Sequence, residues 1–249
     1  MVASAGPHFG EEAPLVGSRG SGTIFFAGCN LLCVFCQNFD ISFYPEKTGR
    51  EMDPKEIGQI MLRLSRLGCH NVNLVTPTHV VGPLLEAVWW AGKRGFNLPI
   101  VYNCGGYESV ESLRLLDGVV DIYMPDFKYW DPEIAARLSG ASDYPAKARA
   151  ALREMHRQVG DLEIGDDGVA IRGLLVRHLV LPDEMAGTPE ITRFLAEEIS
   201  PQTFINIMGQ YRPAHRSAEH PPLERRVARR EVLRARRQAS RAGLTRIYH

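Results

Sequence analysis

Three cysteines near the start of the chain have a spacing that indicates a specific chemistry more clearly than any other group of residues in the sequence. Cys29, Cys33 and Cys36 follow a C-x3-C-x2-C pattern directly after a short apolar run. Cysteine thiolates are the usual ligands of iron–sulfur clusters, and each of three thiolates can hold one iron of a [4Fe-4S] cube. The fourth iron is then open to a ligand that the protein does not supply. The spacing therefore predicts an iron–sulfur site that can do chemistry.

Two other uses of cysteine compete with this interpretation. A structural zinc site needs four closed ligands, usually from paired C-x2-C motifs, and only Cys69 and Cys104 remain, each placed singly. A disulfide framework is disfavoured because the chain has 5 cysteines, an odd number, and its 249 residues can bury a core without cross-links. Cys104 follows a predicted strand, so it either faces the cluster or is a small buried apolar residue, and the second is the more common role.

The overall composition describes an ordinary globular protein. A length of 249 residues with a hydrophobic fraction of 45% and a charged fraction of 23% is enough for one α/β domain of barrel size. The 29 basic and 29 acidic residues balance, so the bulk charge favours neither a nucleic-acid nor a membrane partner. No apolar run is long enough to cross a bilayer, and the first residues lack a signal-peptide pattern. We expect a cytoplasmic protein, because thiols stay reduced there.

Strand-like and helix-like segments alternate along most of the chain. Residues 1–21 are rich in Gly, Pro and Ser, and we expect them to form an irregular N-terminal segment before a single domain over 22–249. Asp53 and Pro54 are typical of a helix start, and apolar residues then recur at helical spacing as far as Gly68. Strands are predicted over 22–27, 71–75, 99–102, 121–124, 174–181 and 203–208, and helices over 54–67, 84–94, 109–116, 144–159 and 189–198.

Six strand–helix units in succession imply a parallel sheet, either doubly wound or closed toward a barrel. In both arrangements ligands bind at the carboxyl ends of the strands. Residues of chemical interest should therefore follow strands, and the sequence places them there. Cys29, Thr78, Asn103, Asp126 and Tyr211 follow the first, second, third, fourth and sixth predicted strands.

Asp126 and Lys128 are two residues apart, so on extended chain their side chains point to the same face. Together they can hold a zwitterion, or they can form a salt bridge at the rim of the fold, and the spacing leaves both options open. His79 and His178 are further polar candidates at strand ends. A lone histidine on a strand is more often a hydrogen-bonded structural residue than a catalytic one.

The cysteine motif resembles the signature of the radical S-adenosylmethionine (SAM) superfamily, and the aromatic Phe35 just before the third cysteine fits it. In that superfamily SAM chelates the fourth iron, and the reduced cluster cleaves it to methionine and a 5′-deoxyadenosyl radical. The resemblance implies a [4Fe-4S] cluster and SAM as cofactors, an electron donor such as flavodoxin or ferredoxin, and an α/β fold of the open partial (β/α)6 barrel type. It also implies that Phe35 packs near the adenine.

Other segments are similar to the pyruvate formate-lyase activating enzymes and their uncharacterised relatives. The similarity runs from about His8 to the C-terminus and is clearest over 20–26, 35–38 and 206–213. It implies a protein substrate, with a glycyl-radical enzyme as the candidate. Met124 to Lys128 looks like the D-x-K strand end of that family, which implies that Lys128 contacts the SAM carboxylate. Arg177 is a further implied SAM contact, because arginine can form a fork to a carboxylate or ribose.

Two positions depart from the pattern of that family. Radical SAM enzymes commonly carry Gly-Gly-Glu after the second strand, where backbone and carboxylate receive the SAM amino group, and here Thr78 stands in that place. Its hydroxyl accepts hydrogen bonds but has no charge. Asn103 stands where activating enzymes often have an aspartate, and a neutral amide gives less reason to expect a bound cation beside SAM.

Arginines crowd the C-terminal part of the chain, which we predict to be a helix. Such a helix can contact nucleic acid, or it can be a solvated outer helix, and the second is favoured. The arginine-rich composition supports a second hypothesis, of a different class: a non-catalytic metal-binding or RNA-binding protein. The arginines are Arg225, Arg226, Arg229, Arg230, Arg234, Arg236, Arg237 and Arg241.

Overall fold

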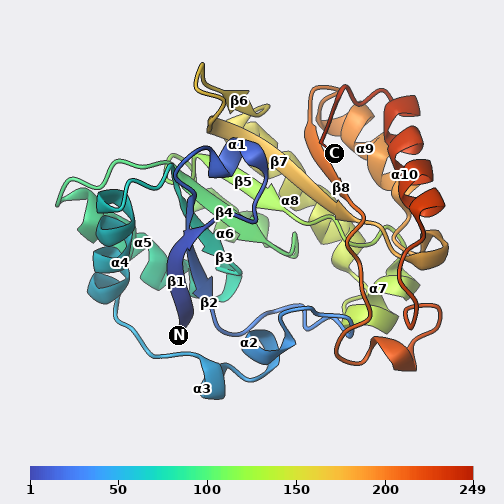
Figure 1. Ribbon diagram of the computed structural model, residues 1–249, viewed down its shortest axis with the longest axis horizontal. Helices are drawn as coiled ribbons and strands as arrows, with labels where there is room; N and C mark the ends of the chain where they lie inside the picture. The colour runs from blue at the N-terminus through green and yellow to red at the C-terminus, as the bar shows by residue number, and fades with distance from the viewer. Residues whose placement is uncertain (249) are drawn as a thin grey trace.

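The computed structural model, which describes residues 1–248, arranges nine strands in one mostly parallel sheet (Figure 1). The order along the sheet is β1-β2-β3-β4-β5-β7-β8-β9, with β6 paired to β7. Neighbours from β2 to β9 along this path are parallel, whereas β1 and β6 are antiparallel to their partners. The strands are β1 Val2–His8, β2 Ser21–Phe26, β3 Val72–Val75, β4 Ile100–Cys104, β5 Ile122–Pro125, β6 Glu163–Ile164, β7 Ala170–Leu179, β8 Phe204–Met208 and β9 Arg246–Tyr248.

The six predicted strands are all present, as β2, β3, β4, β5, β7 and β8, and they are the parallel core of the sheet. The path begins at β1 and ends at β9 without closing among the described residues. This confirms the predicted α/β fold, and the mostly parallel open sheet is consistent with a partial barrel. Among the described residues, no helix has both the length and the apolar character needed to cross a bilayer.

The helices connect successive strands, with α4 and α5 at one end of the molecule and α9 and α10 at the other (Figure 1). The start of α4 shows the predicted signal: the Asp53 side chain accepts a hydrogen bond from the Glu56 N–H at 2.8 Å, and Glu56 accepts one from the Asp53 N–H at 2.9 Å. The helices are α1 Ala13–Val16, α2 Phe39–Phe43, α3 Pro45–Thr48, α4 Pro54–Arg66, α5 Val81–Gly92, α6 Val110–Arg114, α7 Pro132–Ser139, α8 Tyr144–Val159, α9 Thr188–Phe194 and α10 Arg229–Arg241.

Alternate residues of the strands face two separate cores. Side chains such as Leu74 and Val176 pack against the helices in the larger core. The smaller core lies inside the curve of the sheet, where Leu15 of α1 packs among strand residues. Leu15 therefore fills the interior below the carboxyl ends of the strands. Its neighbours in this inner core are Val101, Ile122, Met124, Leu162, Ala170, Leu175 and Phe204.

The prediction that residues 1–21 are irregular is wrong. Residues Val2–His8 form β1, which pairs with β2 from Val2 opposite Phe26 to His8 opposite Ser21, and α1 follows. The N-terminal segment is therefore part of the sheet, and the structure shows no boundary at residue 22. Gly6 and Pro7 obscure the strand pattern in the sequence, and proline is tolerated in a strand at the edge of a sheet.

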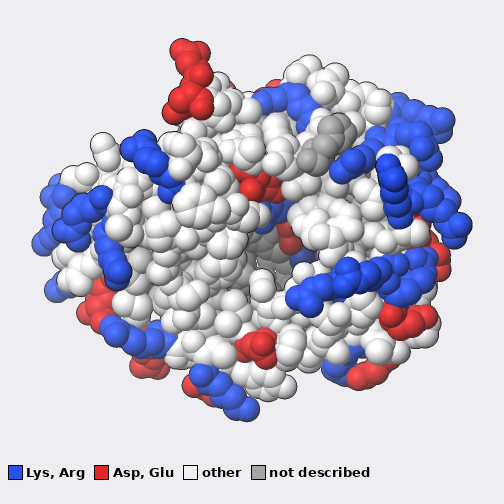
Figure 2. All heavy atoms as spheres, viewed as in Figure 1, with Lys and Arg blue, Asp and Glu red and all other residues white. Residues whose placement is uncertain are grey.

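The predicted arginine-rich helix is present as α10. Its buried residues are Glu231, Ala235 and Ala239, so the small side chains face the protein and most arginines face outward. Figure 2 shows basic side chains gathered over the edge of the molecule where Figure 1 places α10. This is the arrangement of a solvated outer helix, which packs on α9 and on strand β8.

Candidate functional site

The cysteine motif lies on the loop that follows β2. Gly28 has a φ of 92°, which glycine adopts without strain, and it turns the chain out of the strand. The N–H of Gly28 donates to the carbonyl of Ile41 at 2.8 Å. His79 reaches the same turn, with Nε2 2.9 Å from the carbonyl oxygen of Ala27. His79 therefore has a structural partner at the base of the loop.

Contacts from distant segments fix the rest of the loop. The N–H of Val34 donates to the carbonyl of Leu138 at 2.9 Å, and the Val34 carbonyl accepts from the N–H of Arg216 at 2.9 Å. Phe35 is buried and packs edge-to-face against Tyr129 and Tyr211, with ring centroids 6.2 and 6.0 Å away. Phe35 thus anchors the loop in an aromatic cluster, and its predicted place near the adenine stays a prediction.

The three thiols lie within electrostatic reach of one another. Burial raises the pKa of Cys33, and the neighbouring Cys29 raises it further, whereas Lys128 lowers it. Burial also raises the pKa of Cys36, with Cys33 adding to the effect. Ser139 donates a hydrogen bond to the Cys33 sulfur at 3.1 Å. A positive charge and a hydroxyl donor beside Cys33 favour its thiolate, the form that binds metal.

Within residues 1–248, no three His, Cys, Asp or Glu side chains converge closely enough to hold a single metal ion. A [4Fe-4S] cube binds each thiolate at a different iron, so its ligands do not need to meet at one point. Three neighbouring thiols on one loop, with a lysine beside them, fit such a cluster. Cys69 and Cys104 are buried, and burial raises the pKa of Cys104 well above its ordinary value, so it remains a neutral thiol.

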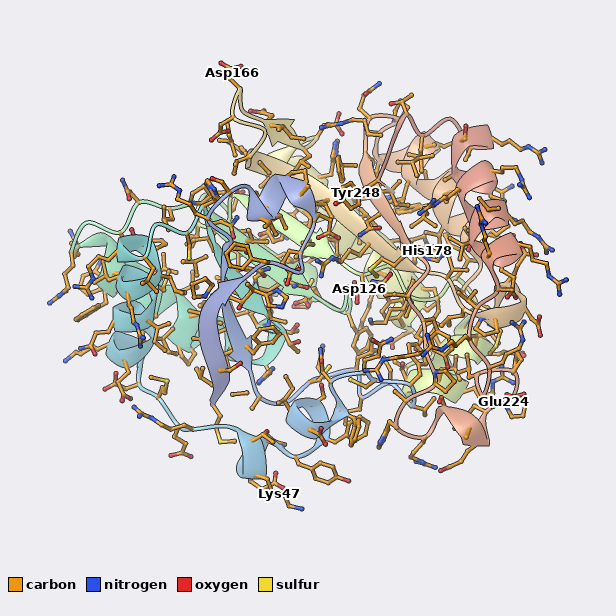
Figure 3. All side chains as sticks on the ribbon, in the orientation of Figure 1. Lys47, Asp126, Asp166, His178, Glu224 and Tyr248 are labelled. Carbon is orange, nitrogen blue, oxygen red and sulfur yellow. The ribbon has the colours of Figure 1, made fainter. Side chains whose placement is uncertain are left out.

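Asp126 and Lys128 come together just after β5, as their spacing predicts. Lys128 Nζ lies 2.5 Å from Asp126 Oδ2, and both side chains are largely shielded from solvent. Burial by itself lowers the pKa of Lys128, but the adjacent Asp126 and Cys33 outweigh it, and the net pKa lies above the ordinary value. Lys128 is therefore an ammonium held between a carboxylate and the cysteine loop. Figure 3 shows Asp126 near the centre of the molecule.

Arg177 lies beside Asp126 at the adjoining end of β7 and has protein partners. Its Nε donates to Glu12 Oε1 at 2.8 Å and its Nη2 to Glu12 Oε2 at 2.5 Å, and Glu11 also pairs with Nη2. Asn206 of β8 donates to Glu12 Oε1 at 2.7 Å. The N–H groups in these bonds are not free for a ligand, so the implied contact between Arg177 and SAM stays a prediction.

The face of the molecule in Figure 2 is hollowed near its centre, with acidic and basic atoms together at the edge and in the depth of the hollow. This is also where Figure 3 places Asp126. The strands explain the position. Met124 and Leu175 belong to the inner core, and two residues further along the same strands come Asp126 and Arg177. The polar residues therefore stand at the carboxyl ends of the strands, above an apolar interior.

Thr78 lies three residues after β3, and Asn103 lies within β4, one residue before the strand ends at Cys104, so both are near the carboxyl ends of these strands. The backbone carbonyl of Asn103, a buried residue, accepts from the N–H of Thr76 at 2.8 Å. Thr78 Oγ1 lies 2.6 Å from Oε1 of Glu108, a buried glutamate that the sequence analysis missed. The available signal was its position in a glycine-containing loop directly after a predicted strand.

His178 is a structural residue. It is fully buried, with Nδ1 2.8 Å from the Phe127 carbonyl and Nε2 2.8 Å from the Thr188 hydroxyl. Burial lowers its pKa, so it is neutral at physiological pH. Val176 of β7 and Val180, just after the strand, belong to the helix-side core, which places His178 (Figure 3) on the outer side of the sheet.

Comparison with known proteins decides the family. The Radical SAM superfamily model matches residues 23–179, which is more than half of the chain and contains the cysteine loop and the Asp126–Lys128 pair. The chain belongs to the radical SAM superfamily. Members of this superfamily use a [4Fe-4S] cluster and SAM, so these are the cofactors of this protein and it is an enzyme. The cluster supplies the electron that cleaves SAM to a radical.

The radical SAM chain is also similar to the uncharacterized protein MJ0674 of Methanocaldococcus jannaschii. The two are 35% identical, and the match covers 97% of this chain and 67% of the other. The chain thus spans about two thirds of the length of that relative. Because the match covers 97% of this chain, the similarity extends well beyond residues 23–179.

Proposed function

We propose that this radical SAM enzyme uses its 5′-deoxyadenosyl radical to abstract hydrogen from a protein, and that a glycyl-radical enzyme is the substrate. The observation that supports SAM binding most directly is the Lys128 ammonium, shielded from solvent and paired to Asp126 at 2.5 Å beside the cysteine loop. The protein-substrate proposal rests on the similarity of 20–26, 35–38 and 206–213 to the activating enzymes. The enzyme works in the cytoplasm with a flavodoxin or ferredoxin as electron donor.

Different residues bind the cluster and SAM. Cys29, Cys33 and Cys36 hold three irons of the cluster. Lys128 binds the SAM carboxylate, and Asp126 keeps its ammonium aimed into the site through their 2.5 Å contact. A charge-assisted contact of this kind is stronger away from bulk water than in it.

Anaerobic reconstitution with iron and sulfide tests the enzyme activity. We expect about four irons per chain, and production of 5′-deoxyadenosine and methionine when reductant and SAM are added. The competing hypothesis is a non-catalytic metal-binding or RNA-binding protein. One tightly held zinc with no SAM cleavage would support that hypothesis and contradict ours.

A labelling experiment tests the substrate separately. A candidate glycyl-radical enzyme is prepared with α-deuterated glycine and incubated with the reduced, SAM-loaded enzyme. We expect deuterium in the 5′-deoxyadenosine and a glycyl radical signal in the electron paramagnetic resonance spectrum. The same protein with its target glycine replaced by alanine is the control. SAM cleavage without deuterium transfer, across a panel of such proteins, would reject the substrate and leave the radical chemistry intact.

A further inference from the structure

Cys33 is the most deeply buried of the three cluster cysteines. Its exposed fraction is 7%, whereas Cys29 and Cys36 are half-buried. A thiolate that binds iron at Cys33 therefore has little water around it to stabilise its negative charge. Hydrogen bonds from protein groups have to replace that hydration.

The last turn of helix α7 supplies such a hydrogen bond. The helix ends beside the cysteine loop (Figure 1), where the Leu138 carbonyl accepts from the N–H of Val34 at 2.9 Å. The next residue, Ser139, donates its hydroxyl hydrogen to the Cys33 sulfur, with Oγ 3.1 Å from Sγ. Two successive residues of α7 thus bind two successive residues of the loop.

A second hydroxyl orients the first. Tyr129 is fully buried, and its hydroxyl oxygen lies 2.8 Å from Ser139 Oγ. A phenol carries its proton at neutral pH, so it can donate to the Ser139 oxygen and leave the single Ser139 hydrogen for the Cys33 sulfur. Phe35 and Tyr144 fix the Tyr129 ring, with ring centroids 6.2 and 5.3 Å away. The two hydroxyls form a chain that ends on the sulfur, in which each hydrogen bond polarises the next.

The other two cluster cysteines have longer contacts. The Leu31 N–H donates to the Cys29 sulfur at 3.4 Å, and the Ser42 hydroxyl oxygen lies 3.5 Å from the Cys36 sulfur. Among the hydrogen bonds of the described residues, the one to Cys33 is therefore the shortest that reaches a cluster cysteine.

We propose that Ser139, oriented by Tyr129, raises the reduction potential of the [4Fe-4S] cluster through its hydrogen bond to Cys33. The cluster gains one negative charge when it accepts an electron from the donor protein. A hydrogen bond to a ligand sulfur stabilises this reduced state more than the oxidised state. Ser139 acts through a ligand of the cluster, so it is a positioning residue. Its role is the same whichever substrate receives the radical, so the labelling experiment can reject the protein substrate without affecting this inference.

An anaerobic redox titration of the cluster-loaded protein, without SAM, tests the proposal. The reduced cluster is followed by electron paramagnetic resonance as the potential is lowered. We expect Ser139→Ala to lower the equilibrium constant for one-electron reduction about 3- to 10-fold, the size of one hydrogen bond. This is a shift of about 28–59 mV to lower potential. Ser139→Thr keeps the hydroxyl and should keep the wild-type potential. Tyr129→Phe should shift the potential in the same direction by less, because Ser139 keeps its own hydrogen bond.

Controls separate this role from a structural one. Ser42→Ala removes a hydroxyl from the longer contact at Cys36, so it should shift the potential less than Ser139→Ala. Iron analysis and melting curves show whether each variant keeps its cluster and fold. An unchanged potential in Ser139→Ala with a full cluster would overturn the proposal, and so would equal shifts in the alanine and threonine variants, since packing would then be the cause. If Ser139→Ala does not hold a full cluster, Tyr129→Phe decides: a lowered potential supports the proposal and an unchanged one overturns it.

Discussion

For Lys128, a role in binding SAM and a purely structural role predict different outcomes of the same substitution. If it holds the SAM carboxylate, Lys128→Ala should keep a normal cluster and fold yet weaken SAM binding by about one to two powers of ten, for a lost charge-assisted bond of about 1.5–3 kcal/mol. Titration of SAM into reconstituted protein measures this, with melting curves alongside. Lys147→Ala, which removes an exposed ion pair with Asp143 at 2.9 Å, is the control. Unchanged affinity with a lowered melting temperature would make the Asp126 pair a structural salt bridge only.

The cysteines give a second prediction at this scale. Replacing Cys29, Cys33 or Cys36 by alanine should abolish the visible absorbance of the reconstituted cluster, because each thiolate holds a separate iron. Cys69→Ala and Cys104→Ala should retain it, since both side chains are buried and burial raises the pKa of each thiol, which disfavours the thiolate that binds iron. Iron and sulfide analysis of each variant measures the loss. Absence of the cluster in the Cys104 variant would show that a ligand has been misplaced.

The sequence predicted which side chains come together at the site for some residues and not for others. The cysteine site and the Asp126–Lys128 pair could be predicted from the sequence, because the partners are only a few residues apart and local spacing alone brings them together. The position of Glu108 could not be predicted in this way, because its partner Thr78 is 30 residues away and on a different loop. Only the pairing of β3 with β4 makes these loops neighbours.

Helices and strands were predicted correctly where burial requires apolar residues in a regular pattern. The parallel strands are covered on both faces and read as apolar runs, and the helix over 144–159 has the same bounds as α8. It failed for short elements whose stability comes from a neighbour. The strand β1 lacks an apolar pattern, and β9 has only 3 residues, which pair with β8. The helix α7 went unassigned although Asp131 caps it and Pro132 starts it.

The start of α10 provides a prediction for one element. Glu231 accepts from both Arg225 Nη atoms at 2.8 Å, from the Ala228 N–H at 2.7 Å and from the Asp183 N–H at 2.9 Å. Arg225 is the main cause of a Glu231 pKa lowered to about 2, with burial opposing it. Glu231→Gln should lower stability at pH 7 by about 2 kcal/mol and the melting temperature by about 4–8 °C.

The acid dependence of this effect follows from the lowered pKa. The contribution is complete above the ordinary glutamate pKa of 4.5 and is lost as pH falls toward the folded pKa of about 2. Wild type and Glu231→Gln should therefore differ most near neutral pH and converge in acid. Urea unfolding at several pH values measures the difference, and the exposed Glu224→Gln is the control. A constant difference down to pH 3 would show that packing, not charge, carries the effect.

On the scale of the whole molecule, the N-terminal segment joins parts of the chain that no local signal connects. Glu12 contacts Arg177 and Asn206, which are 165 and 194 residues away. Through these contacts the segment before β2 binds β7 and β8 on the far side of the sheet. Family resemblance pointed to Arg177 as a SAM contact. The carboxylates of Glu11 and Glu12 give it a structural role that the sequence did not reveal.

The last prediction tests that role. Burial alone raises the pKa of Glu12, but Arg177 outweighs it, so the net pKa is below the ordinary value. Glu12→Ala should destabilise the protein at pH 7 by about 3 kcal/mol, the lower end for breaking a buried pair because Glu11 remains. The loss should shrink as pH falls below the ordinary value of 4.5, since the wild-type carboxylate is then protonated too. Urea unfolding at pH 7 and in acid, with the exposed Glu163→Ala as control, measures both.

A double variant then separates stability from SAM binding. Replacing both partners with apolar residues, as Glu12→Leu with Arg177→Met, leaves no unpaired buried charge and should recover much of the stability lost in Glu12→Ala. If Arg177 serves only to hold the N-terminal segment, the folded double variant should bind SAM as tightly as wild type. A stable double variant with SAM affinity weakened tenfold or more would instead restore Arg177 to the SAM site, with Glu11 and Glu12 orienting it.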